Sequence, residues 1–588
     1  MDSSRSLAST RFGAAFYAWL RARWTARLTL RSDIALALAA SLAWAVLYNL
    51  QFWHQAIDAM WSPTPRAALF LISLFVVIVC LQSLLLALVP TRLGMRIAAS
   101  VLFPVAALGS YFANAYGAVM NEDMLRNVLQ TDPAEVGGLI NFDLVAHFVL
   151  LGVIPALLVW RIALPSSTWR VRLRQRLIFI GCTLALCAVA LFACSANYAV
   201  FFRAHKPIRY SLSPAAPVVS LAGLLSAEQR RDPHAPLINV AGTVQRTTAA
   251  GHKPLVLFLV VGETARAADF QLGGYARATN PRLAGMPGLV YYDHATSCGT
   301  STAISVPCMF SHLPREQFDV EQADRYTNLL DSLVKAGLSV EWRDNNAGCK
   351  GVCARVVDVA YRGESDPVHC PNSYCYDEVM LSDLTARLDA VQSDTVVIFH
   401  AIGSHGPAYS ERYPPQFEIF KPACRSNELQ HCSREEIVNA YDNSIAYTDY
   451  MLSRQIQLLQ AHADRLDSVL LYASDHGESL GEQGIYLHGM PYGFAPRVQK
   501  EVPMLFWASN GYRERTGLSM ACMRSHAHDA ISHDNIYHTV LGAMAVRDAV
   551  YDPAMDLFAG CRGSLPQVTK NAPPMHEPIA FVANQRLK

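Results

Sequence analysis

The sequence predicts a two-part architecture, in which an N-terminal α-helical membrane domain of five transmembrane helices precedes an exported α/β domain. Hydrophobic residues make up 52% of the 588-residue chain and charged residues only 16%, and the apolar excess lies before residue 202. From Leu255 onward, short β-rich runs alternate with helical segments. We therefore expect a membrane domain over residues 1–201, a connector over 202–250 and an exported domain over 251–588.

Five apolar runs approach or exceed the roughly 20 residues that a helix needs to cross a bilayer. A single run of this kind could be a core helix of a soluble protein, but five in series make that alternative poor. The third run is the weakest, because Pro104, Gly109 and Asn114 interrupt it. The predicted spans are Ile34–Phe52, Ala67–Val89, Ile97–Val119, Phe142–Trp160 and Leu177–Phe201.

Arginines gather on alternate sides of these spans, and this asymmetry predicts the orientation of the chain. They are concentrated before the first span, between the second and third, and between the fourth and fifth. Because cytoplasmic loops carry the excess of positive charge, we expect a cytoplasmic N-terminus and an exported chain after the fifth span. The arginines are Arg5, Arg11, Arg21, Arg23, Arg27, Arg31, Arg92, Arg96, Arg161, Arg170, Arg172, Arg174 and Arg176.

Ten of the 14 cysteines lie in the exported part, and an even number in an oxidising compartment predicts disulfides. A zinc cluster is the alternative, but its thiolates would have to stay reduced after export. The remaining cysteines fall in apolar spans, where we expect them to act as small packing residues. Spacing alone does not establish connectivity; pairing between sequence neighbours predicts Cys298–Cys308, Cys349–Cys353, Cys370–Cys375, Cys424–Cys432 and Cys522–Cys561.

The connector is rich in proline and contains one helical segment, Val218–Arg231, with an amphipathic pattern. A helix lying in the membrane interface and a plain linker helix are both compatible with this pattern. The net charge of +1 gives no indication of a nucleic-acid partner.

The exported part alternates strands with helices, which predicts a largely parallel sheet covered on both faces. Two expected helices are Tyr326–Ala336 and a long helix after Ser433, where Ser433 and Glu436 form a capping-box pattern. The expected strands are Leu255–Val261, Ser339–Arg343, Thr395–Phe399, Ser468–Ala473 and Val502–Ala508. Function in such sheets gathers beyond the carboxyl ends of the strands, where this chain carries Glu263, Asp344, Asn345, His400, His405, Asp475 and His476.

Glu263, Asp475 and His476 are the residue types that a catalytic zinc ion takes as ligands, with one position left open. The adjacent Asp475 and His476 can both be ligands only from a turn, because neighbours on a straight strand point to opposite faces. Gly477 favours such a turn. Taken singly, each residue could instead be a helix-capping carboxylate or an ordinary buried histidine.

The segment from Cys298 to Ala303 resembles a loop that enters a helix, and a helix N-terminus stabilises a bound anion. A hydroxyl there could act as a nucleophile if a metal ion activates it. From the residues alone, Thr300, Ser301 and Thr302 are nearly equal candidates, and an ordinary N-cap is the alternative.

Three further residues could bind a second metal ion or a phosphate group. His405 lies in the segment SHGP, and His488 lies in LHG. Lys350 lies between Cys349 and Cys353, where a tight bridge would hold it in position to pair with a phosphate. A solvated surface lysine is an equally good interpretation of Lys350.

The chain contains, in order, VVGETARAADFQLGGYARATNPRL, SCGTSTAISVPCMFS, WRDNN, SHGPAY, AYDNSIAYTD and SDHGESLGEQGIYLHGMPYGFAP. These segments resemble the phosphoethanolamine–lipid A transferases, a family that includes the polymyxin-resistance enzymes of Gram-negative bacteria. The resemblance extends over essentially the whole chain. It implies an alkaline-phosphatase/sulfatase-like fold for the exported domain and a periplasmic location on the bacterial inner membrane.

The resemblance also implies roles for individual residues. It selects Thr302 as the nucleophile and assigns one zinc ion to Glu263, Thr302, Asp475 and His476. It assigns a second metal ion or substrate phosphate to His405 and His488, with Lys350 nearby. The implied contacts to the donor lipid fall on Asn127, Thr131 and Glu135, within NVLQTDPAE.

The implied reaction has two steps. Thr302 takes phosphoethanolamine from phosphatidylethanolamine, and a lipid A phosphate then accepts it, which weakens the binding of cationic peptides such as polymyxin. We expect a monomer that works among membrane lipids. Alternatives are an acceptor in the lipopolysaccharide core or another envelope glycan, glycerol-phosphate transfer from phosphatidylglycerol, and a non-enzymatic membrane sensor with a closed structural zinc site.

Overall fold

A computed structural model describes the chain from residue 30 to residue 571, except for residues 31, 131–135, 138, 165–167, 231, 233–234, 248–251, 362–365, 372–373 and 564–568. The chain packs as two units. The first comprises Met1–Asn121 and Ile140–Ala222, and the second comprises Glu122–Leu139 and Gly223–Lys588. The division expected at residues 201 and 250 stays a prediction.

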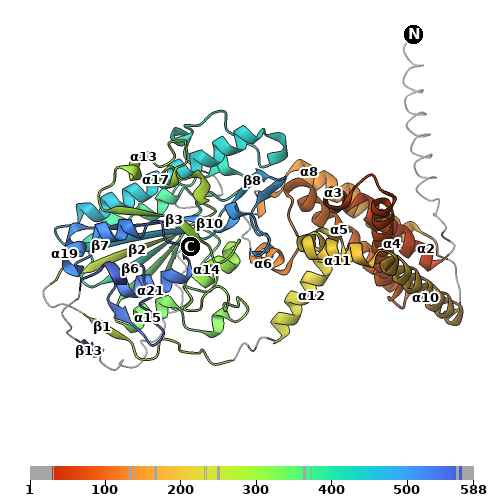
Figure 1. Ribbon diagram of the computed structural model, residues 1–588, viewed down its shortest axis with the longest axis horizontal. Helices are drawn as coiled ribbons and strands as arrows, with labels where there is room; N and C mark the ends of the chain where they lie inside the picture. The colour runs from red at the N-terminus through yellow and green to blue at the C-terminus, as the bar shows by residue number, and fades with distance from the viewer. Residues whose placement is uncertain are drawn as a thin grey trace, which may run out of the picture. The chain divides into compact units, whose positions relative to one another are not determined.

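The first unit consists of apolar helices (Figure 1). Within the described residues, four helical stretches are long and apolar enough to cross a membrane, and a fifth is counted if the pair α2 and α3, bent by 63°, forms one span. The elements are α2 (Asp33–Leu47), α3 (Leu50–Met60), α4 (Pro65–Ala87), α5 (Arg92–Tyr116), α8 (Phe142–His147), the π-helix η1 (Phe148–Val153), α9 (Ile154–Arg161), α10 (Trp169–Ala193) and α11 (Ser195–Ala204).

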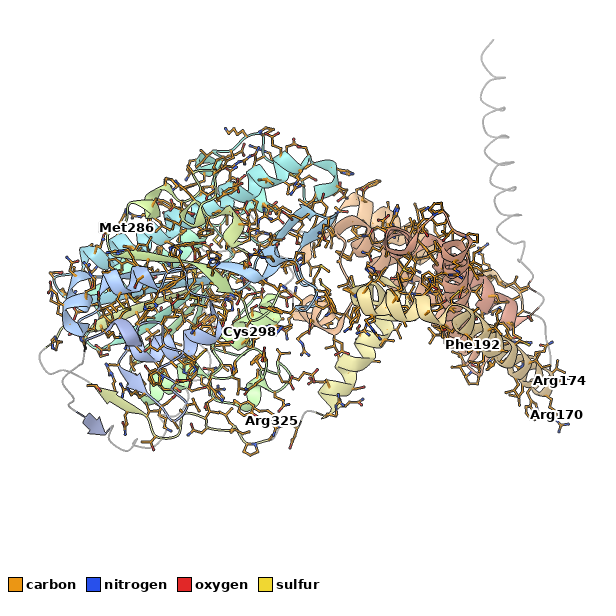
Figure 2. All side chains as sticks on the ribbon, viewed as in Figure 1. Arg170, Arg174, Phe192, Met286, Cys298 and Arg325 are labelled. Carbon is orange, nitrogen blue, oxygen red and sulfur yellow. A yellow bond between two sulfur atoms is a disulfide. The ribbon has the colours of Figure 1, made fainter. Side chains whose placement is uncertain are left out.

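The last predicted span is displaced from the helix that the structure contains. Helix α10 begins at Trp169 rather than Leu177 and ends at Ala193, and α11 follows after Cys194. Figure 2 shows Arg170 and Arg174 at the N-terminal end of α10 and Phe192 towards its other end. The difference arises because the basic residues continue the helix into the polar region, whereas hydropathy marks only its apolar part. Phe192 is 85% exposed, as expected for a side chain that faces lipid.

The second unit is built around an eight-stranded sheet with the order β11-β3-β10-β7-β2-β6-β4-β5. Strand β2 pairs in parallel with β6 and β7, whereas β10 runs antiparallel to β3 and β7. Every residue of β2 and β7 is buried, as expected for central strands covered on both faces. The strands are β2 (Leu255–Gly262), β3 (Leu289–Thr296), β4 (Ser339–Asp344), β5 (Val357–Ala360), β6 (Thr395–His400), β7 (Asp467–Ser474), β10 (Glu501–Ala508) and β11 (Ile531–Ser532).

All five predicted strands are present, and the prediction of a largely parallel sheet is confirmed. Helices cover both faces, with α13 (Pro281–Ala284) and α17 (Arg434–Ala461) on one and α14 (Thr302–Met309), α15 (Leu329–Lys335) and α21 (Asp534–Ala543) on the other (Figure 1). The expected capping box is present at α17, where Ser433 Oγ accepts from the Glu436 N–H and the Glu436 carboxylate accepts from the Ser433 N–H.

The smaller elements complete the second unit. A three-stranded sheet has the order β12-β1-β13, and β8 pairs with β9 in a hairpin. Helix α12 (Ala215–Arg230), which runs from the first unit into the second, covers the helical segment expected in the connector as far as Arg230; residue 231 lies outside the described residues. The others are α6 (Glu122–Gln130), α16 (Leu384–Asp389), α18 (Arg497–Lys500), α19 (Asn510–Thr516), α20 (Met520–Ser525), β1 (Gln245–Thr247), β8 (Ser479–Glu482), β9 (Ile485–Leu487), β12 (Val546–Arg547) and β13 (Thr569–Asn571).

Five disulfides connect the pairs that sequence proximity predicts. Most close short loops, but Cys522–Cys561 joins cysteines 39 residues apart, whereas those of Cys370–Cys375 are 5 apart. A cross-link removes more conformational entropy from the unfolded chain when the loop that it closes is longer.

Removal of the Cys522–Cys561 bridge is therefore expected to destabilise the protein more than removal of Cys370–Cys375. The loop lengths predict losses of about 4 and about 2 kcal/mol, respectively. The measurement is the free energy of unfolding of the double Cys→Ser variants under oxidising conditions, with Cys370→Ser/Cys375→Ser as the matched control. An equal loss in the two variants would contradict the loop-length argument.

Candidate active site

The pairing of β2 with β7 determines which side chains meet at the carboxyl edge of the sheet. Gly262 lies opposite Ser474 in parallel register. The next residues, Glu263 and Asp475, therefore leave the sheet side by side, and the Asp475 N–H donates to the Gly262 carbonyl oxygen over 2.9 Å. Residues separated by more than two hundred positions in the sequence are adjacent here because of one strand pair.

Glu263, Asp475 and His476 form a compact set of metal-ligand atoms. Each offers one ligand atom, and the three atoms lie within 4.8 Å of one another. His476 Nε2 is 3.3 Å from Glu263 Oε1 and 3.3 Å from Asp475 Oδ2. These two oxygens are buried and accept no hydrogen bond from the described part of the chain. Two unsatisfied carboxylate oxygens facing one imidazole nitrogen fit a divalent cation.

The orientation of His476 supports this assignment. Its Nδ1 lies 3.0 Å from the Gly477 carbonyl oxygen, which can only accept a hydrogen bond. Nδ1 therefore carries the proton, and the lone pair of Nε2 faces the two carboxylates. An N–H hydrogen bond of this kind is the usual partner of a metal-binding imidazole.

The turn that carries Asp475 and His476 depends on glycine at position 477. The chain bends directly after β7, as the adjacent ligands require. The Gly477 N–H donates to the Gln499 carbonyl oxygen over 3.0 Å, and a Cβ atom on residue 477 would clash with the Val498 carbonyl oxygen. A side chain at this position would push the ligand turn away from its neighbour.

Thr302 lies beside this set at the first position of α14. Its hydroxyl donates to Glu263 Oε2 over 3.0 Å and lies 3.4 Å from His476 Nε2. Ser301 occupies the N-cap position, so the alternative of Thr302 as an ordinary N-cap is not supported. Of the three hydroxyls that were candidates, Thr302 is the one that contacts Glu263, whereas Thr300 donates to the Met490 carbonyl oxygen over 2.6 Å.

Burial alters the ionisation of these groups. It raises the pKa of Glu263, with the neighbouring Asp475 carboxylate acting in the same direction, and it raises the pKa of Asp475 to about 6. It lowers the pKa of His476 to about 4, so the ring is neutral at pH 7. A neutral imidazole and two carboxylates are the forms that bind a cation, and a bound cation would offset the cost of burying both negative charges.

The structure also brings His405 and His488 to this site. The His488 ring centroid lies 4.3 Å from that of His476 and 5.5 Å from that of His405. Glu478, which was not predicted from the sequence, contacts His488. Its carboxylate lies 2.9 Å from His488 Nδ1 and accepts from Tyr409 Oη over 2.7 Å. Its position two residues after His476 is the only sequence signal for this contact.

The end of β4 differs from expectation. Asp344 and His400 were expected beside Glu263 and Asp475 at the carboxyl edge of the sheet. Instead, they lie opposite each other in register and pair with each other over 3.1 Å. Trp342 Nε1 also donates to Asp344, over 2.8 Å. Asn346 contacts the site instead, since its Nδ2 donates to Glu263 Oε2 over 2.9 Å.

Asn345, also expected at this edge, turns away from the ligands. Its Nδ2 donates to Asp377 Oδ1 over 2.9 Å and to the Cys375 carbonyl oxygen over 3.0 Å. The Asp377 carboxylate also accepts from the N–H groups of Ile402 and Gly403, in the loop that leads to His405. Asn345 therefore supports the loop that carries His405 and contacts no metal-ligand atom.

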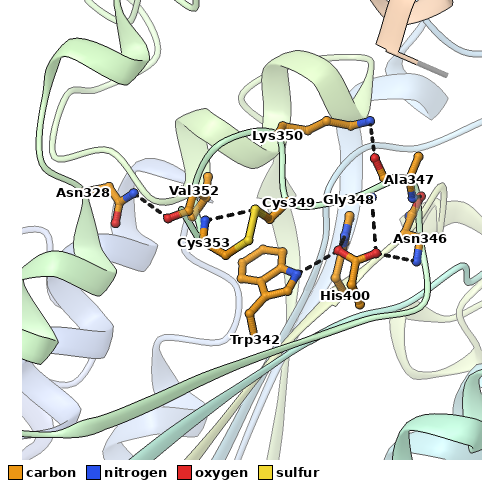
Figure 3. The surroundings of a disulfide bond; sticks show 11 residues. Asn328, Trp342, Asn346, Ala347, Gly348, Cys349, Lys350, Val352, Cys353 and His400 are labelled. Atoms are coloured by element: carbon orange, nitrogen blue, oxygen red, sulfur yellow. Dashed lines mark hydrogen bonds and ion pairs between the residues drawn. A yellow bond between two sulfur atoms is a disulfide. The ribbon is translucent and has the colours of Figure 1, made fainter. Parts of the chain in front are cut away.

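Lys350 lies in the tight loop of the Cys349–Cys353 disulfide, as Figure 3 shows. Its Nζ donates to the Ala347 carbonyl oxygen over 2.9 Å and to the Gln130 carbonyl oxygen over 3.2 Å. Its φ of +51° is a strained conformation for a non-glycine residue, and the bridge holds it there. The expected pairing with a phosphate stays a prediction.

A cavity of about 230 Å³ lies next to α14, the helix that begins at Thr302. Its walls include Ala303 and Pro307 of α14, Arg126 and Gln130 of α6, and Lys350. Asn127, one of the expected contacts to the donor lipid, lies on α6 between Arg126 and Gln130. The other two, Thr131 and Glu135, lie outside the described residues.

Comparison with known proteins matches both parts of the chain. Residues 78–228 match the family model described as phosphoethanolamine transferase EptA/EptB, and residues 256–546 match the sulfatase model. The phosphoethanolamine transferase EptA of Salmonella typhimurium is 39% identical over 90% of this chain and 97% of its own length. The phosphatidylethanolamine transferase Mcr-1 of Escherichia coli is 41% identical over 74% of this chain and 81% of its own.

A solved structure agrees with these matches. The integral membrane protein lipooligosaccharide phosphoethanolamine transferase A from Neisseria meningitidis superposes with a TM-score of 0.88 at 34% identity, covering 92% of this chain and 100% of that one. With a helical membrane region, a sulfatase-like α/β domain and relatives of this similarity over most of their length, the chain belongs to the phosphoethanolamine transferase family.

Proposed function

We propose that this protein transfers phosphoethanolamine from phosphatidylethanolamine to a phosphate group of lipid A through a covalent phosphoethanolaminyl-Thr302 intermediate. The observation that carries the proposal is the Thr302 hydroxyl, which lies 3.0 Å from Glu263 at the start of a helix and next to the ligand atoms of Asp475 and His476. Membership of the transferase family supports the choice of the transferred group.

Glu263, Asp475 and His476, with Thr302 as a fourth donor, would hold Zn²⁺. When bound, the ion would acidify the threonine hydroxyl and offset negative charge on the phosphoryl group. One zinc ion is the minimum that this ligand set supports, and a second could be bound by His405 and His488, whose rings lie 5.5 Å apart.

In the first step, Thr302 Oγ forms a bond to the phosphorus of phosphatidylethanolamine. The bond between phosphorus and the diacylglycerol oxygen breaks, and diacylglycerol leaves with a proton. The N-terminus of α14 would stabilise the phosphoryl charge, and His405, His488 and Lys350 would contact its oxygens. The donor lipid would be held by Asn127, Thr131 and Glu135.

In the second step, an oxygen of the lipid A phosphate attacks the phosphorus, and Thr302 leaves as a hydroxyl. The ammonium group gained by lipid A would offset its negative charge and lower its affinity for polymyxin. Both substrates are lipids, which explains a catalytic domain on a membrane anchor. We place the protein in the bacterial inner membrane as a monomer, with a cytoplasmic N-terminus and a periplasmic catalytic domain.

The variant Thr302→Ala is expected to lower transfer by roughly 10⁴-fold or more, because losing a covalent nucleophile removes the pathway itself. The measurement uses headgroup-labelled phosphatidylethanolamine together with intact-protein mass spectrometry of the labelled intermediate. Thr300→Ala is the matched control and should still become labelled. Labelling of the Thr302→Ala protein at wild-type level would rule out Thr302 as the nucleophile.

Zinc is expected to stabilise the protein more strongly as the pH rises from about 4 to 7. Without metal, the pKa of Asp475 is about 6, which exceeds the unfolded value of about 3.9. The folded state therefore binds more protons than the unfolded state between these values, so the metal-free protein loses stability as the pH rises. Zinc needs the deprotonated carboxylate and binds better over the same range.

The check is the difference in Tm between zinc-loaded and chelator-treated protein, measured at several pH values. Asp475→Asn should remove most of the pH dependence of this difference. A difference that narrows as the pH rises would contradict the assignment of Asp475 as a metal ligand.

A further inference from the structure

His533 is a buried histidine that contacts two segments of the active site without being part of the ligand set. Its side chain is 1% exposed. It lies between β11 and α21, and its own N–H donates to the Thr296 carbonyl oxygen over 3.0 Å at the end of β3. His533 lies outside all the sequence segments that carry the family resemblance.

Both ring nitrogens of His533 bond to backbone groups. Nδ1 lies 3.1 Å from the N–H of Cys298, which can only donate. Nε2 lies 2.9 Å from the carbonyl oxygen of Ser474, which can only accept. A neutral imidazole with its proton on Nε2 satisfies both groups at once, and no other form of the ring does so. Burial lowers the pKa of His533 to about 3, so this neutral form persists at pH 7.

The two bonded segments are those that position the reacting groups. Cys298 begins the nucleophile loop and is joined by a disulfide to Cys308 in α14, the helix that starts at Thr302. Ser474 directly precedes Asp475. Its Oγ accepts from the Ala265 N–H over 2.8 Å and donates to the His476 carbonyl oxygen over 3.0 Å.

One imidazole ring therefore connects the loop of the nucleophile with the turn of the metal ligands, and Ser474 extends this connection to the segment after Glu263. We propose that His533 is a positioning residue for the transfer reaction. It fixes the position of Thr302 relative to Asp475 and His476. This inference rests on the proposed function. A shift of about 1 Å in a reacting group can lower a rate by about 10²-fold, so loss of the bridge should act on kcat more than on KM.

Three variants of His533 separate its two hydrogen bonds. His533→Phe keeps the ring volume and loses both bonds. His533→Asn provides an acceptor near the position of Nδ1, and His533→Gln provides a donor near the position of Nε2. We expect kcat to fall about 10²-fold in His533→Phe, with KM for phosphatidylethanolamine changed by less than about threefold, and to recover partly in the other two variants.

His538, within α21, offers a matched control close to His533 in the sequence. It is also buried, and its Nδ1 accepts from the Asp552 N–H over 3.0 Å, but neither group contacts the nucleophile loop or the ligand turn. His538→Phe should lower Tm by an amount similar to His533→Phe and leave kcat near the wild-type value. All variants are assayed as full-length, zinc-loaded protein at a temperature well below the lowest Tm.

A second measurement does not depend on turnover. Competition with a chelator should show zinc affinity about tenfold weaker in His533→Phe than in His538→Phe, because the ligand turn has lost a support. If wild-type protein bound zinc but transferred no phosphoethanolamine, the proposed function would fail, and this comparison would still test the positioning role. If His533→Phe does not fold, His533→Asn and His533→Gln are compared with His538→Phe in the same way.

The proposal is overturned if kcat and zinc affinity of His533→Phe match those of His538→Phe. Equal losses in both variants would show general destabilisation, and wild-type values in both would show that the bridge is dispensable. Recovery of kcat by a variant that restores one bond, without a matching recovery of Tm, would support positioning over simple packing.

Discussion

The active site depends on the parallel pairing of two central strands, β2 and β7. Their register places Gly262 opposite Ser474 and so brings Glu263 and Asp475 together at one edge of the sheet. Both strands are completely buried, so the side chains on both of their faces are packed inside the domain. The hydrogen bonds of Asn346, Ser474 and His533 then fix the side chains and turns around this edge.

The pairing creates an electrostatic problem that a bound cation would solve. Two carboxylates lie in a buried environment, and the oxygen atoms that face His476 accept no hydrogen bond from the described residues. Burial of unpaired charge is costly, so stability alone would not favour this arrangement. Instead, the protein keeps a buried polar site within this domain, as is typical where function rather than stability determines the residues.

Much of this fold could be predicted from sequence because hydrophobic burial dominates it. The five predicted strands are β-rich runs, and Ser433 with Glu436 marks the start of α17 correctly. Strand β3 (LVYYDHAT) escapes prediction because its apolar run is short and is followed by Asp and His, and its pairing with the distant β10 is decided by tertiary structure. Hydropathy likewise misplaces α10, whose helix extends beyond its apolar part.

A site residue could be predicted where its side chain is a typical metal ligand and it directly follows a strand, as for Glu263 and Asp475. Side-chain direction was not predictable. Asp344 and His400 follow the same rule, yet their register makes them partners of each other. Asn346, Glu478 and His533 were missed because their roles come from contacts that form only in three dimensions.

The pairing of β3 with β10 has a consequence for biosynthesis. The loop that leads to Thr302 follows β3 directly, but the strand that anchors β3 lies about two hundred residues later in the chain, at Glu501–Ala508. A nascent chain that has exposed Thr302 outside the membrane therefore still lacks the strand that supports this loop, and it also lacks Asp475 and His476. Such long-range contacts form late in folding, so cleavage of membrane lipids would begin only after translocation of the whole domain is complete.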